Sequence, residues 1–115
     1  MSPAEELRAA ATLLRETASK ATPGPWTVHT IAGIGRTVND PEGSLSIPVG
    51  TSWVSADDGA WIALMSPAVA EPLAAVLDDQ AATYEVWLSR ENHDVAERIV
   101  LRALVLARSI LGRTA

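Results

Sequence analysis

The chain has 115 residues, of which 48% are hydrophobic, and it carries a formal net charge of −5. This length and composition predict a single globular domain with a modest core, and the absence of cysteine excludes disulfides and thiolate chemistry. The sequence shows no apolar run of transmembrane length and no export signal, so we expect no membrane partner and a cytoplasmic location.

The N-terminal stretch predicts a helix over residues 2–21. Ser2-Pro-Ala-Glu5 is a capping box with proline at the first helical position. An apolar stripe follows at helical spacing and is formed by Leu7, Ala10, Ala11, Leu14 and Ala18. The helix should end at Thr22-Pro-Gly-Pro25, because two prolines and a glycine cannot continue it.

Residues 26–54 predict antiparallel strands. The segment 26–32, WTVHTIA, is rich in residues that favour extended backbone. Residues 39–43, Asn-Asp-Pro-Glu-Gly, form a strong turn signal, and apolar residues then alternate with polar ones over 45–49. Pro48 has no N–H for a strand ladder, which predicts an edge strand or a neighbouring bulge. The segment is therefore a small antiparallel hairpin or meander.

A short helix is expected over 57–65. Ser55 followed by Asp58 is a variant of the capping box. Trp61, Leu64 and Met65 fall at positions i, i+3 and i+4, so they share one face of this helix.

A longer helix is expected over 67–89. Pro72 lies too far into this segment for an undisturbed helix, so we expect a kink or a fresh start near Glu71. Between Leu73 and Leu88 the apolar residues form one arc and the acidic residues lie outside it. The arc comprises Leu73, Ala74, Val76, Leu77, Ala81, Tyr84, Trp87 and Leu88. Gln80 lies inside this arc, either as a rim position with its amide satisfied or as a polar group in a pocket.

The last helix is expected over 93–111, capped by Asn92 or Ser89 and ended by Gly112. Its apolar arc is unusually wide, which predicts burial on two sides. Leu101 and Val105 lie outside even this arc, beside Arg98 and Arg102. We therefore expect the helix to occupy the core and also to meet another subunit through these four residues, giving a homodimer or a larger oligomer.

Charge is distributed unevenly along the chain, because no lysine or arginine occurs between Arg36 and Arg90. One interpretation is that the acidic helix 67–89 lies antiparallel to the arginine-bearing last helix, with ion pairs along the rim. The other is a charged surface that faces a partner. Nucleic acid is not an expected partner, because the sequence pI of about 4.9 opposes phosphate binding.

The candidate chemical groups do not form a catalytic constellation. His29 is accompanied by no nucleophile and no second histidine. Gly33-Ile-Gly35 lacks the remainder of a phosphate-binding loop, and the paired acids at 57–58 and 78–79 lack the spacing of a metal site. The sequence predicts a protein that is not an enzyme and that has no metal and no cofactor.

Three segments carry a family resemblance. The first helix ends in Ala21-Thr-Pro-Gly-Pro-Trp26, a later segment reads Asp-Gly-Ala-Trp-Ile-Ala63, and a helix of the form xPAVAxxLA follows. This pattern resembles small accessory proteins of phages and prophages, the Ead-like group of lambdoid phages and their actinobacterial relatives. The resemblance covers residues 4–26 and 57–77. It implies a role in host interaction or counter-defence within the host cytoplasm, and it brings no catalytic residues with it.

These observations predict an α+β fold with an N-terminal helix, a small antiparallel hairpin or meander, a short helix and a C-terminal antiparallel helical hairpin. The first functional hypothesis is an oligomeric interaction module that binds a host or phage protein. The alternative is a protein that binds a nucleotide-type ligand in a tryptophan-lined pocket, since tryptophan offers a stacking face and a donor. The expected ligand- or partner-binding residues are Trp26, His29, Trp53, Trp61 and Gln80.

Overall fold

The computed structural model describes residues 1–31, 35–50 and 54–112, and it confirms the predicted α+β class. The chain forms two compact units. A helical unit comprises Met1–Thr17 with Glu71–Ala115, and a sheet unit comprises Ala18–Ala70. The expectation of a single domain over 1–115 stays a prediction, and each unit is described by itself.

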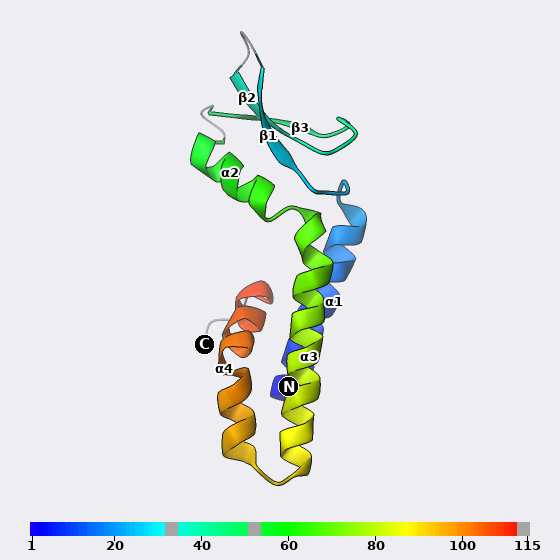
Figure 1. The fold of residues 1–115 in the computed structure, drawn as a ribbon, viewed down its shortest axis with the longest axis vertical. Coiled ribbons are helices and arrows are strands. Elements are labelled where there is room, and N and C mark those ends of the chain that lie inside the picture. The colour runs from blue at the N-terminus through cyan, green and yellow to red at the C-terminus, as the bar shows by residue number, and fades with distance from the viewer. Residues whose placement is uncertain (32–34, 51–53, 113–115) are drawn as a thin grey trace. The chain divides into compact units, whose positions relative to one another are not determined.

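The helical unit is built from α1 (Pro3–Lys20), α3 (Ala70–Ser89) and α4 (His93–Ile110). Figure 1 shows α3 and α4 running in opposite directions as a helical hairpin. The predicted capping box opens α1, because the Glu5 amide donates to Ser2 Oγ at 3.1 Å and the Ser2 amide faces Glu5 Oε1 at 3.4 Å. Of the two candidates for the α4 cap, Asn92 fills the position: its side chain accepts from the Val95 amide at 3.3 Å.

The core of the helical unit is made mostly of small residues. Its buried members are Leu7, Ala10 and Ala11 of α1, Ala74, Leu77, Ala81 and Tyr84 of α3, and Ala96, Val100 and Ala107 of α4, with Ala4 beside them. Alanine lets helix backbones approach closely, while the few large side chains supply most of the buried area. Val76 lies in the predicted apolar arc of α3 but is 52% exposed, because the packed face of α3 is narrower than that arc.

The ion pairs of the helical unit differ from the predicted ones. The described pairs are Arg8–Glu85, Arg15–Glu71, Arg15–Asp78 and Arg108–Glu6. Among the described residues, the acids of α3 pair with arginines of α1 and not with those of α4. The interpretation that α3 and α4 are antiparallel is confirmed (Figure 1), whereas the ion pairs that it placed between them are wrong. Arg8 and Arg15 are seven residues apart, so two turns of α1 place both on the side that faces α3.

The sheet unit contains three antiparallel strands in the order β1 (Thr27–Ile31), β2 (Gly35–Asn39) and β3 (Ser46–Val49). In the central strand, Val38 lies opposite Val28 on one side and Ile47 on the other. Pro48 lies in β3 at the edge of the sheet, as its missing N–H donor predicts.

The turn between β2 and β3 is organised by Asp40. This buried carboxylate accepts from the Leu45 amide at 2.6 Å and from Ser44 Oγ at 2.9 Å. The hydrogen bond from Leu45, with that from Ser44, holds the pKa of Asp40 below its ordinary value. Gly43 has a positive φ of 76°, which glycine adopts without strain. The turn signal at 39–43 is thus confirmed.

The chain leaves the sheet through α2 (Ala56–Leu64), a 3₁₀ turn η1 (Pro67–Val69) and then α3. Because α3 begins at Ala70, Pro72 falls in its first turn, where proline is tolerated. Gly24, in the segment that follows α1, lies directly against η1. A Cβ at this position would come within 2.7 Å of Ser66 Oγ and 2.9 Å of the Ala68 amide nitrogen.

One stretch of the described chain, Ala56–Ser89, is apolar enough over an 18-residue window to resemble a membrane span by length and composition, with a mean hydropathy of 1.6. The sequence-based expectation that no such run exists is therefore wrong. The stretch includes the break between α2 and α3 at η1, and a core helix of a soluble protein passes the same test.

Candidate functional site

The helix α2 packs on the sheet through its smallest residues. Gly59 and Ala63 are buried on the side of α2 that meets Val38 and Val49. A Cβ at Gly59 would lie 2.8 Å from Val49 Cβ and still closer to Val49 Cγ1. The backbone of α2 therefore lies against β3 at a distance that only glycine permits.

The large apolar residues of α2 face outward as a result. Trp61 is 63% exposed and Leu64 is 66% exposed, while Met65 at the end of the helix is also exposed. The sequence places these three residues on one face, and the structure leaves that face uncovered by the described residues.

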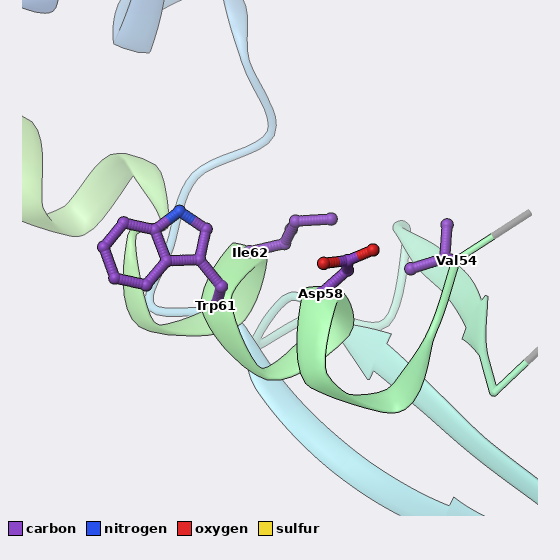
Figure 2. Close-up of a pocket in the computed structure, with 4 residues that line it drawn as sticks. All are labelled: Val54, Asp58, Trp61 and Ile62. Carbon is purple, nitrogen blue, oxygen red and sulfur yellow. The ribbon is translucent and has the colours of Figure 1, made fainter.

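An open depression of about 330 Å³ lies beside Trp61 on this outer side. It is lined by Val54, Asp58, Trp61 and Ile62. Figure 2 shows the Asp58 carboxylate between the side chains of Ile62 and Val54, with the Trp61 ring at the other end. Asp58, Trp61 and Ile62 stand at positions i, i+3 and i+4 of α2, which places them on neighbouring parts of one side of the helix.

The helix cap leaves the Asp58 carboxylate available to the depression. It is the backbone amide of Asp58 that donates to Ser55 Oγ, at 3.0 Å. Among the described residues, no lysine or arginine forms an ion pair with this carboxylate. The depression thus combines apolar walls with one carboxylate that has no described ion-pair partner, and this charge opposes the binding of phosphate-bearing ligands.

The predicted site residues lie in different places. Trp26 is partly buried beside the cluster of Val38, Val49 and Ala63, and its indole Nε1 donates to the Thr22 carbonyl at 3.0 Å. His29 is exposed, with Nε2 2.7 Å from Thr27 Oγ1. Its cross-strand partner is Thr37, so His29 lies on the sheet face opposite Val38.

Gln80 and Trp53 are the other two predicted binding residues outside α2. Gln80 is partly buried on α3 and belongs to the helical unit, and Trp53 lies outside the described residues. Of the described members of the set, Trp61 lines the depression, and Trp26, His29 and Gln80 do not. Val54, Asp58 and Ile62 were not predicted as site residues from the sequence, in which Asp58 was considered only as part of a cap and of an acidic pair. The helical spacing from Asp58 to Trp61 and Ile62 was the signal that could have identified them.

The predicted oligomer contacts lie together on α4. Leu101 is 58% exposed and Val105 is 51% exposed, and Arg98 and Arg102 are exposed beside them. Arg98 and Leu101 also line a second open depression, of about 470 Å³, with Asp94 and Glu97. The prediction that α4 has large apolar residues outside its packed face is confirmed, whereas the subunit contact itself stays a prediction.

Within residues 1–31, 35–50 and 54–112, no group of three or more histidine, aspartate or glutamate side chains is placed to hold a metal ion. Two side-chain atoms in the described part of β2, Thr37 Oγ1 and Asn39 Oδ1, are buried without a hydrogen-bond partner. They belong to the same sheet face as His29. No protein family model, curated protein or solved structure matches the chain.

Proposed function

We propose that the protein is a non-enzymatic interaction module of the phage and prophage accessory type, which acts in the host cytoplasm by binding protein surfaces, its own included. The observation that carries this proposal is the outward display of large apolar side chains by two helices, Trp61 and Leu64 on α2 and Leu101 and Val105 on α4. Clusters of exposed apolar residues mark interaction sites on soluble proteins. The phage-type assignment rests on the sequence resemblance alone.

Self-association is assigned to the exposed face of α4. Leu101 and Val105 are one turn apart and would bury their side chains together against a second subunit. Arg98 and Arg102 flank them and would form the polar rim that surrounds the apolar centre of most interfaces.

A nucleotide-type ligand is the weaker hypothesis. The depression beside Trp61 supplies an exposed indole for stacking, but the Asp58 carboxylate repels a phosphate group at the same place. No described cation lies among the lining residues to offset this repulsion.

Sedimentation equilibrium tests the proposal on the full chain. We expect masses at multiples of 12.1 kDa that increase with concentration, and a shift to monomer when Leu101 and Val105 are both replaced by glutamate. Val86→Glu is the matched control, because Val86 is also an exposed valine in the helical unit. It should leave the association unchanged.

A wild-type protein that remains monomeric at several hundred micromolar would contradict the oligomeric part of the proposal. Equal dissociation by Val86→Glu would show that charge anywhere on the helical unit disrupts association, and would remove the assignment to α4.

A further inference from the structure

We propose that the depression on α2 binds an arginine side chain presented by a partner protein, with Asp58 as the anionic contact and Trp61 as the stacking surface. This inference rests on the proposed function, because it names the chemistry that one of the two exposed surfaces recognises. Three properties of the depression support it: charge, aromatic surface and apolar walls.

The charge of the site complements a cation supplied by a partner. The Asp58 carboxylate forms no ion pair with a described residue, and the chain holds no lysine or arginine from residue 37 to residue 89. Asp57, on the same turn, adds a second exposed negative charge. Arg36 of β2 lies opposite Val49 on the sheet face that α2 covers, and it forms no described ion pair with either acid. The two carboxylates at this end of α2 complement a basic segment and oppose an anionic lipid surface.

The aromatic surface favours a guanidinium group. Tryptophan is the best aromatic partner for a cation, and arginine stacks on it more often than lysine does. The same protein already contains this arrangement, because the Arg90 guanidinium carbon lies 5.5 Å from the centroid of the Trp87 ring. Trp61 has the exposed ring but no such internal cation among the described residues.

The apolar walls suit the aliphatic part of an arginine side chain. Val54 and Ile62 are partly buried and line the depression on either side of the Asp58 carboxylate (Figure 2). Methylene groups of arginine pack on such surfaces while the charged end reaches a polar partner. The volume of about 330 Å³ lies at the lower end of the range for ligand pockets, which fits one side chain.

The test is a two-dimensional NMR titration of the tryptophan indole N–H signals in the full chain. The probes are N-acetyl-arginine methylamide and N-acetyl-citrulline methylamide, which have nearly the same shape but differ in charge. The Trp61 signal is assigned from the spectrum of Trp61→Phe. We expect a saturable shift of the Trp61 signal with the arginine probe in the millimolar range and none with the citrulline probe.

Two matched variants localise the effect. Asp58→Asn should weaken binding of the arginine probe by about fivefold, the factor expected for loss of one exposed ion pair. Asp57→Asn removes the same charge one position earlier, where the side chain does not line the depression, and should leave binding unchanged. Both variants keep the Ser55 cap, because the donor in that cap is the backbone amide of residue 58.

Equal shifts with citrulline, equal losses in both variants, or no shift of the Trp61 signal would each overturn the inference. So would equal binding of N-acetyl-lysine methylamide, or a Trp61 response to phosphatidylcholine vesicles and not to the arginine probe. Sedimentation separates this inference from the proposed function. Asp58→Asn should leave self-association through α4 intact, and loss of α4 association should leave the Trp61 titration intact.

Discussion

The two units of the molecule achieve close packing in different ways. In the helical unit, large residues such as Leu7 and Leu77 point inward together with the alanines, and three helices share one core. In the sheet unit, the buried hydrophobic cluster consists of Val38, Val49 and Ala63, and α2 meets the sheet through Gly59. The large residues of α2 point outward instead. The comparison shows that an apolar helix face need not be the buried face when a glycine and an alanine on another side permit closer contact.

The largest expected effect concerns the core of the helical unit. Leu77→Ala should lower the free energy of unfolding by about 2–5 kcal/mol, because Leu77 is fully buried and its loss leaves a cavity. Val76→Ala is the matched control, since the adjacent valine is half exposed and should change stability by less than about 0.5 kcal/mol. Urea unfolding measures both. Similar losses in the two variants would contradict the described packing of α3.

The next effect concerns the contact between α2 and the sheet. Replacement of a glycine by alanine at an exposed helical position normally stabilises a protein by about 0.5–1 kcal/mol. Here we expect the opposite sign, a loss of about 1–3 kcal/mol, because the added Cβ overlaps the Val49 side chain. Thermal unfolding of the variant and the wild type measures this loss of stability.

Two further variants sharpen this prediction. Val49→Ala combined with Gly59→Ala should recover part of the loss, because truncating Val49 makes room for the new methyl group. Ala60→Val adds volume at the exposed neighbouring position and should have little effect. Stabilisation by Gly59→Ala alone would show that α2 does not approach β3 closely.

The smallest expected effect is a pH dependence of the turn in the sheet unit. The Asp40 pKa is lower in the folded chain than its ordinary value of 3.8. Its contribution to stability is therefore complete above the unfolded pKa and is lost as the pH falls through the folded pKa. Protonation should weaken the hydrogen bond from the Leu45 amide and speed hydrogen exchange at that amide.

NMR-detected exchange of Leu45 between pH 5 and pH 2 measures this effect. Asp40→Asn should remove the pH dependence, and Glu42→Gln in the same turn should preserve it, because Glu42 is exposed. A Leu45 exchange rate with no acid dependence beyond that of an unstructured peptide would contradict the role of the Asp40 carboxylate.

The local features of the fold could be predicted from the sequence because they depend on residues close together in the chain. The caps at Ser2, Ser55 and Asn92 and the turn at 39–43 are of this kind. The α+β class follows from the same local signals.

Features that depend on which elements meet could not be predicted. The acids of α3 are conspicuous in the sequence, but periodicity does not show whether arginines of α1 or of α4 lie beside them. Gly59 is indistinguishable in the sequence from a glycine that merely weakens a helix. The exposure of Trp61 follows from the contact of Gly59 with β3, so it could not be predicted from the sequence either.

The contact of Gly24 with Ser66 and Ala68 has a consequence for the modular construction of the chain. It holds the segment that enters the sheet unit beside the segment that leaves it. The sheet unit therefore has the topology of an inserted module, because the segment through which the chain enters it lies beside the segment through which the chain leaves it. Loops within the sheet can lengthen, shorten or change sequence while the distance that the chain must span between α1 and α3 stays the same.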